Sequence, residues 1–409
     1  MKRKLEVAIA GGGIGGLTAA LALRARGLDA FVFEQAPAFR EIGAGISLGA
    51  NAVLLLKRVG LENRLKSNGS ANTGLTLLTW QGVPVATSPR PANPLPPGEV
   101  NSYTVHRAEF VTLLMEALPK EALHFGHRCV KAEERSDRVR LTFANGSVAE
   151  ADVFVGADGI HSVSQREIGL RTRPTSEGCM AYRGLIPAER LPWAKDLNSL
   201  KMWVGSGRSF ICYPVSRGRL VNIVAFVPTD LDCAESWSAP GDIEKLAAEY
   251  AGWDTPVLQM IGALDETLRW GIYDRAPLPY WSTARMTLLG DAAHPMVPHF
   301  GQGAGQAIED GFALAALLED ADIEQVPARL KAYQQLRRDR TSRVQAVSRE
   351  AGRFYRSEHR SSAEREKHLA TWTSAGRWIF DYDVEKAATE LLSELGAPAP
   401  SGTQRVSRR

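Results

Sequence analysis

The sequence predicts an α/β fold, in which a parallel sheet with flanking helices is joined to an inserted, mostly antiparallel β-sheet domain and a helical C-terminal region. Residues 1–34 combine two short apolar runs, a glycine-rich turn and a run of helix formers, which together are typical of a βαβ unit. Residues 180–227 contain four strand-like segments without a long helix between them, as an antiparallel sheet requires. A strand, a loop and a helix then return after residue 285, and a charged helical stretch follows them.

These patterns divide the chain into a cofactor-binding domain that is interrupted by a substrate-binding sheet. Part of the substrate domain is expected near residues 70–105, within the first cofactor-binding segment. The predicted segments are 1–178 (cofactor-binding), 179–283 (substrate-binding β-sheet), 284–350 (return to the cofactor-binding domain), 351–396 (C-terminal helices) and 397–409 (disordered tail).

Composition excludes several classes of function. The chain has 409 residues, 44% of them hydrophobic, so it can bury a large core and a cleft between domains. Its net charge of +3 reflects three arginines in the final segment GTQRVSRR, and no basic stripe with interleaved aromatic residues indicates nucleic-acid binding. We therefore expect a small-molecule enzyme, as a monomer or a homodimer.

The four cysteines are widely spaced and lack nearby histidines at ligand spacing, so neither a disulfide framework nor a zinc site is predicted. His294, His299 and Asp291 share one irregular loop without a register that would bring three ligands together, and we predict no metal. The apolar run after the basic N-terminus contains Glu6 and leads into the glycine motif, unlike a signal peptide. No run approaches the length of a membrane span, and we expect a soluble, cytoplasmic protein.

The glycine-rich turn has the pattern Gly11-x-Gly13-x-x-Gly16 between a strand and a helix. Glycines at this spacing permit a tight turn and let a pyrophosphate approach the N-terminus of the helix. Glu34 ends the second strand, where its carboxylate can accept hydrogen bonds from ribose hydroxyls. The pattern predicts a Rossmann-like dinucleotide site, to which we also assign Gln35, beside Glu34, and Gly45, in a later glycine-rich segment.

Two further motifs identify the dinucleotide. VFVGADGIHSVSQR at 153–166 and LLGDAAHPMVPHFGQGAGQAIEDG at 288–311, together with GGGIGG, resemble the three fingerprints of the group A flavoprotein aromatic hydroxylases. The resemblance spans nearly all of residues 5–350 and implies FAD as cofactor, with NADH or NADPH as reductant.

The resemblance assigns cofactor roles to three charged residues. It implies that Asp291 binds the ribityl chain of FAD, that Asp158 contributes to binding of FAD and the nicotinamide cofactor, and that Arg107 contacts the flavin side of FAD. From the residues alone, the loop PHFGQGAGQ opens a helix whose first N–H groups, those of Gly303 and Ala304, can stabilise negative charge on reduced flavin.

Within that family the chain is most similar to salicylate hydroxylases, through MAYRG at 180–184, YPVSRGRLVNIVAF at 213–226 and FDYDVE near the C-terminus. It departs from many relatives by carrying Ser209 and Cys212 where they have histidines. His299 is then the best remaining candidate for a general base that takes a phenolic proton. The predicted substrate-binding residues are Tyr182, Tyr213 and Pro298, with Arg183 as a further candidate.

The resemblance implies a monooxygenase that reduces FAD with NAD(P)H, forms a flavin hydroperoxide with dioxygen and hydroxylates a small phenolic or aromatic acid similar to salicylate. Hydroxybenzoate, hydroxynicotinate and other aromatic-ring hydroxylases remain alternatives. So do an oxidoreductase for non-aromatic substrates, such as an epoxidase, and a flavin-binding protein without catalytic activity.

Overall fold

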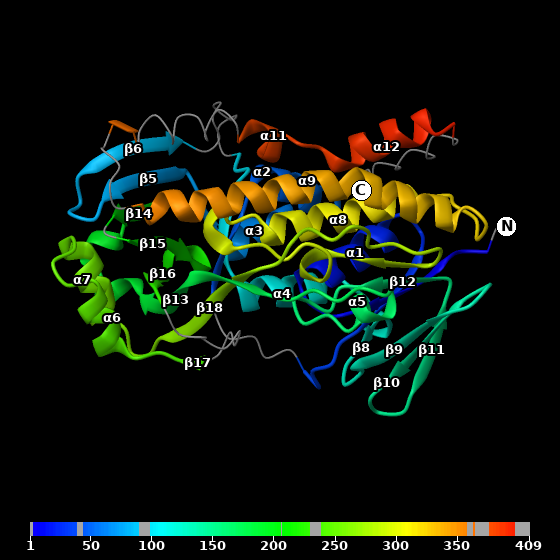
Figure 1. Ribbon diagram of the computed structural model, residues 1–409. Helices are drawn as coiled ribbons and strands as arrows, with labels where there is room; N and C mark the ends of the chain where they lie inside the picture. Colours follow the sequence, from blue (N-terminus) through cyan, green and yellow to red (C-terminus); the bar gives the residue numbers. More distant parts are fainter. Residues whose placement is uncertain are drawn as a thin grey trace.

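The computed structural model describes residues 3–38, 44–89, 99–205, 207–229, 239–357, 363–364 and 376–396. Figure 1 shows two principal sheets toward opposite ends of the molecule, with helix α8 (Gly303–Leu318) near the middle and the longer helix α9 (Val326–Tyr355) running along the molecule past both sheets. Within these ranges, no helix has both the length and the apolar character needed to cross a bilayer. The predicted disordered tail at 397–409 lies outside the described residues.

The first sheet is parallel throughout, with the strand order β19-β12-β1-β2-β8. Its strands are β1 (Glu6–Ala10), β2 (Asp29–Phe33), β8 (Leu123–His124), β12 (Val153–Gly156) and β19 (Met286–Leu288). Helix α1 (Ile14–Ala25) joins β1 to β2, which confirms the predicted βαβ unit. Strand β19 comes from the GD segment, so the predicted return to this domain is part of the same sheet.

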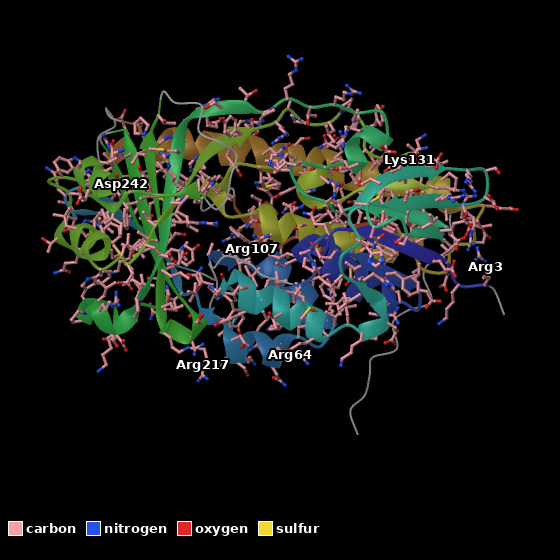
Figure 2. All side chains as sticks on the ribbon, turned by 90° about the horizontal axis from the view of Figure 1, so that it is seen from below. Arg3, Arg64, Arg107, Lys131, Arg217 and Asp242 are labelled. Carbon is pink, nitrogen blue, oxygen red and sulfur yellow. The ribbon has the colours of Figure 1, made fainter. Side chains whose placement is uncertain are left out.

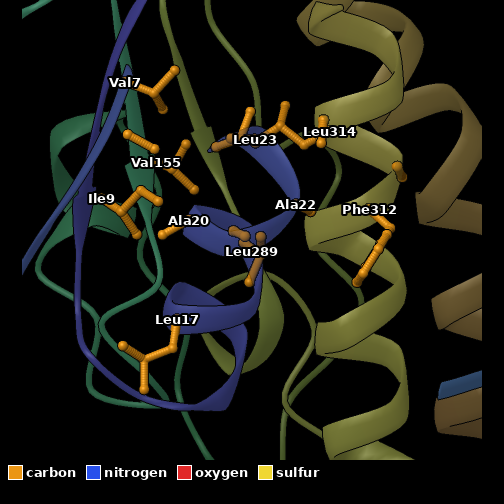
Figure 3. Close-up of a cluster of buried hydrophobic side chains, with 14 of the residues drawn as sticks. Val7, Ile9, Leu17, Ala20, Ala22, Leu23, Val155, Leu289, Phe312 and Leu314 are labelled. Carbon is orange, nitrogen blue, oxygen red and sulfur yellow. The ribbon is translucent and has the colours of Figure 1, made fainter. Parts of the chain in front are cut away.

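Helix α1 is enclosed between the parallel sheet and α8, and Figure 3 shows the apolar side chains that fill this space. Leu17 and Leu23 are fully buried, as is Phe312 of α8. The two helices approach closely because residue 311 is glycine: a Cβ there would lie 2.8 Å from the backbone of Ala19. This packing holds the N-terminal ends of α1 and α8 in a fixed relation.

The second sheet has eight strands in the order β17-β18-β13-β16-β15-β14-β5-β6, and every pair except β14–β5 is antiparallel. The predicted inserted sheet with mostly antiparallel strands is therefore confirmed. Its strands are β5 (Gly74–Thr79), β6 (Pro84–Pro89), β13 (Thr175–Pro187), β14 (Leu200–Gly205), β15 (Arg208–Val215), β16 (Leu220–Pro228), β17 (Ala239–Pro240) and β18 (Leu268–Asp274). Helices α6 (Ile243–Glu249) and α7 (Thr255–Gly262) cover one face.

Two smaller sheets complete the β structure. The predicted hairpin is present as β10 (Val139–Phe143) and β11 (Val148–Ala151), beside β9 (Cys129–Glu134). The glycine-rich segment around residue 45 contains a strand, β3 (Gly45–Leu48), which pairs with β7 (Tyr103–His106), while β4 (Ser70–Ala71) pairs with the other edge of β7. The sequence showed only a loop there because the partner strand lies more than 50 residues further along the chain.

The remaining helices surround these sheets. They are α2 (Ala50–Arg58), α3 (Glu62–Asn68), α4 (Arg107–Glu116), α5 (Ser164–Glu167), α11 (Arg377–Phe380) and α12 (Val384–Glu394). Two predicted boundaries fall inside single elements, since residues 178 and 179 belong to β13 and residues 350 and 351 belong to α9. Helix α9 is continuous past residue 350 because Phe354 and Tyr355 at its end pack against the second sheet.

Candidate functional site

A cavity of about 810 Å³ lies between the carboxyl end of the parallel sheet and the open face of the second sheet. Its size suits a cofactor and a small ligand. Its walls come from the glycine turn after β1, the segment 44–50, the DG segment after β12, the GD segment with the start of α8, the second sheet, and the residues around α11. The three sequence motifs, which are far apart in the chain, thus meet at one site.

The glycine turn has the geometry that a bound diphosphate needs. Gly11 has a φ of 109°, and a Cβ on it would lie 2.3 Å from the carbonyl oxygen of Ala157. A Cβ on Gly16 would lie 2.0 Å from the carbonyl oxygen of Gly11. Gly13, in contrast, faces open space, lines the cavity and precedes α1 without a side-chain cap. The N–H groups at the start of α1 can therefore bind phosphate oxygens, so the turn fits a dinucleotide.

Glu34 lies directly behind this turn. One carboxylate oxygen accepts the N–H of Gly12 at 2.7 Å and the other accepts the N–H of Ala36 at 2.8 Å. The carboxylate orders the glycine turn, and its remaining lone pairs are available for a ribose hydroxyl. Gln35 is exposed and lines the cavity.

Asp291 lies at the end of the parallel sheet, in a short turn after β19. Its carboxyl group lines the cavity and is exposed to it. The surrounding protein raises the pKa of Asp291 by desolvation, although His294, Arg107 and Arg275 favour the charged form. Such a carboxylate gains a favourable interaction when a ligand hydroxyl donates to it.

Arg107 begins α4 and lines the same cavity, and Figure 2 shows it at the centre of the molecule. Its backbone N–H donates to the carbonyl oxygen of Ala44 at 2.8 Å, which ties α4 to the segment containing Gly45. Gly303 and Ala304 also line the cavity, at the N-terminus of the 16-residue helix α8. No side chain caps this end, so its N–H groups and dipole face the cavity.

Asp158 lines the cavity, but its carboxylate also has a structural role. It accepts hydrogen bonds from the hydroxyls of Ser162 and Ser164 and from the N–H groups of Val163 and Ser164, at 2.5 to 3.0 Å. Its carboxylate therefore stabilises the turn into α5, and a cofactor contact would have to use lone pairs beyond these bonds.

The predicted substrate residues divide between the two faces of the second sheet. Tyr213 is buried, lines the cavity and donates to the carbonyl oxygen of Gly45 at 2.7 Å; burial raises its pKa. Tyr182 does not line the cavity, so its assignment to the substrate site was wrong. Successive side chains of β13 point to opposite faces, and Tyr182 packs beneath α6 and α7 while Arg183 faces the cavity.

Pro298 and His299 both line the cavity, as predicted from their position beside the GD motif. The imidazole of His299 is only 6% exposed, with its Nε2 2.9 Å from Nη1 of Arg356 and its ring 4.5 Å from that of Phe226. Burial and the Arg356 charge hold the pKa of His299 well below its usual value. The predicted role of general base does not agree with this geometry, because Arg356 occupies the Nε2 lone pair and Nδ1 is closed to solvent.

A pH profile tests this correction. We expect His299→Gln to leave the shape of the kcat/KM profile around the ordinary histidine pKa unchanged, because an imidazole whose pKa lies well below that value is already neutral there. Loss of an acid limb near the ordinary histidine pKa in the variant would show instead that His299 ionises in the free enzyme and that this ionisation affects catalysis.

A buried ionic network that was not predicted from the sequence lies behind the GD segment. Its members are Arg337 and Arg340 of α9, Glu309 and Asp310 of α8, and His294. Burial opposes ionisation of Asp310, but His294 and Arg337 outweigh it and lower its pKa to about 2. Asp310 also accepts the N–H of Gly290 at 2.9 Å, next to Asp291. The sequence did contain a signal for this network, because two adjacent acids stand in the mostly apolar sequence of α8.

The fold and site resemble those of known proteins. The family described as FAD binding domain matches residues 4–348. A 3-amino-4-hydroxybenzoate 2-monooxygenase of Streptomyces platensis is 40% identical over 85% of this chain and 87% of its own length. A 6-hydroxynicotinate 3-monooxygenase of Bordetella bronchiseptica is 34% identical over 94% of this chain and 97% of its own. A solved salicylate hydroxylase substrate complex covers 95% of this chain and 98% of its own, at 30% identity and a TM-score of 0.82.

Proposed function

This chain belongs to the FAD binding domain family and is a flavin-dependent aromatic-ring monooxygenase, and from that premise we propose that its substrate is a small aromatic acid with a ring hydroxyl group. Its relatives act on aminohydroxybenzoate, hydroxynicotinate and salicylate, which all combine a carboxylate with a hydroxyl group on an aromatic ring. The substrate class of this chain is inferred from the cavity wall.

One observation carries this proposal: among the described residues that the second sheet contributes to the cavity, Arg183 alone is charged. Its neighbours on this wall are mostly apolar or aromatic, including Met202, Ile211 and Phe226. The guanidinium group is buried and lies 5.0 Å from the centre of the Trp270 ring. A carboxylate is the ligand group that a guanidinium binds most specifically, and the apolar wall suits an aromatic ring.

When bound, FAD would supply the redox chemistry that couples oxidation of NADH or NADPH to the transfer of one oxygen atom from dioxygen to the ring. The residues of the chain bind FAD and the substrate and orient them. The start of α1 would hold the diphosphate of FAD, Asp291 would accept a hydrogen bond from the ribityl chain, and the N–H groups of Gly303 and Ala304 would stabilise negative charge on the flavin. Arg183 fixes the carboxylate of the substrate, and the apolar wall excludes water.

Arg183→Met tests the proposed substrate class. A charged hydrogen bond contributes about 1.5 to 3 kcal/mol, so we expect the KM for hydroxybenzoates to rise about 10-fold to 100-fold. The matching phenols without a carboxylate are the internal control, and their KM should change little. Steady-state NAD(P)H oxidation with product analysis gives both values. A rise in KM that is the same for acids and phenols would contradict the proposal.

A further inference from the structure

The residues around α11 line the cavity, although the family match ends at residue 348. Four residues of this segment, Gly376, Arg377, Phe380 and Asp381, belong to the cavity wall. We propose that the α11 segment, residues 376–381, is a wall of the flavin chamber and that Phe380 keeps water out of it. This inference rests on the monooxygenase activity and not on the identity of the substrate.

Phe380 fills the gap between two other parts of the wall. Its ring stacks on Phe300, with ring centres 6.4 Å apart and an interplanar angle of 25°. A Cβ on Gly49 would lie 2.8 Å from two atoms of the Phe380 ring, so the ring rests on the bare backbone at the start of α2. Gly49 and Phe300 both line the cavity. Figure 1 shows α11 beside α2, which agrees with this contact.

Arg340 of α9 fixes the backbone of the α11 segment. Its guanidinium donates to the carbonyl oxygens of Trp378 at 2.8 Å and Ile379 at 3.0 Å, and also to Glu309 at 2.8 Å. The same group lies 3.8 Å from the centre of the Tyr382 ring. Because Glu309 belongs to α8, this cation joins the α11 segment to the helix whose N-terminus lines the cavity.

Ion pairs hold the residues that follow the α11 segment against helices α1 and α2. Asp383 accepts a hydrogen bond from Arg58 of α2 at 2.8 Å and also caps α12. Glu385 pairs with Arg58 and with Arg26 of α1. The α11 segment is therefore anchored on both α8 and α2, and Phe380 is the side chain that this anchoring places in the wall.

An aromatic wall at this position has a chemical consequence. Water that enters the chamber diverts reduced flavin and dioxygen to hydrogen peroxide instead of hydroxylated product, since oxygen transfer requires a dry site. Truncating Phe380 removes most of the apolar bulk between Gly49 and Phe300. We therefore expect the bound FAD to become more accessible and the reaction to become less coupled.

The test compares Phe380→Ala with Phe380→Leu, which restores bulk, and with Leu392→Ala. Leu392 is the matched control, because it is a buried residue of α12 that does not line the cavity. Iodide quenching of bound FAD fluorescence needs no substrate, and peroxide formed per NAD(P)H consumed measures coupling with an aromatic acid that the wild type hydroxylates.

We expect Phe380→Ala to retain FAD while both the quenching constant and the peroxide fraction rise several-fold, with Phe380→Leu and Leu392→Ala close to wild type. Wild-type quenching in Phe380→Ala would overturn the proposal. An equal rise in Leu392→Ala would also overturn it, because the effect would then reflect loosened packing. Raised quenching with unchanged coupling would refute the role in excluding water from the reaction.

Discussion

Asp291→Ala is expected to release FAD from the protein. A ribityl hydroxyl that loses a charged acceptor loses about 1.5 to 3 kcal/mol, so we expect FAD to bind about 10-fold to 100-fold more weakly. Fluorescence titration of the apoprotein with FAD measures this change. Asp339→Ala is the control, because Asp339 is an exposed acid whose side chain is 88% accessible. Full FAD occupancy of the Asp291 variant after dilution would contradict the assignment.

Asp291→Asn separates this role from a role in folding. Desolvation by the protein around the cavity raises the pKa of Asp291 in the folded protein above its unfolded value. At neutral pH the carboxyl is ionised in the unfolded chain, so the raised pKa in the folded state lowers the stability of the apoprotein. We expect Asp291→Asn to raise the Tm of the apoprotein at pH 7 and still to weaken FAD binding. A lower Tm would mean that the carboxylate supports the fold.

Arg337→Met is expected to have the largest effect on stability. The side chains of Arg337, Glu309 and Asp310 are fully buried, and the variant leaves both carboxylates without the cation between them. Removing one partner of a buried ion pair costs about 3 to 5 kcal/mol. Urea unfolding measures the loss, and Arg338→Met is the control, because the neighbouring Arg338 side chain is 41% exposed. Equal stability of the two variants would contradict the proposed importance of the network.

The network also predicts how stability depends on pH. The pKa values of Glu309 and Asp310 lie below their ordinary values in the folded protein, that of Asp310 at about 2. Their contribution is therefore complete above about pH 5 and is lost as the pH falls toward 2. In Arg337→Met we expect a weaker loss of stability over this range.

The cofactor side of the site could be predicted from sequence because its contacts are local. Gly11, Gly16 and Glu34 lie within one βαβ unit, and Asp291 and Gly303 lie within one strand, loop and helix. In both segments the residue types and their spacing already determine the backbone geometry. The parallel sheet, the inserted antiparallel sheet and the helical end followed from the same periodicities.

The substrate side could not be predicted in the same way. Alternation along β13 places Tyr182 and Arg183 on opposite faces, but the cover of α6 and α7 over one face decides which of them reaches the cavity. Arg337 and Arg340 belong to a charged stretch that is typical of a solvated helix. They are buried because α8 presents two carboxylates to them across the helix interface. His299 is likewise neutral because the fold buries it, and the charge of Arg356, which is distant in sequence, adds to this effect.

The most direct test of the account is turnover under ¹⁸O₂ with NAD(P)H and a series of hydroxybenzoic acids, analysed by mass spectrometry of the products. The account predicts that at least one acid stimulates NAD(P)H oxidation and yields a product with one ¹⁸O atom on the ring. Protein that retains FAD but converts NAD(P)H only to peroxide with every aromatic acid, or a product whose new oxygen comes from water, would contradict it.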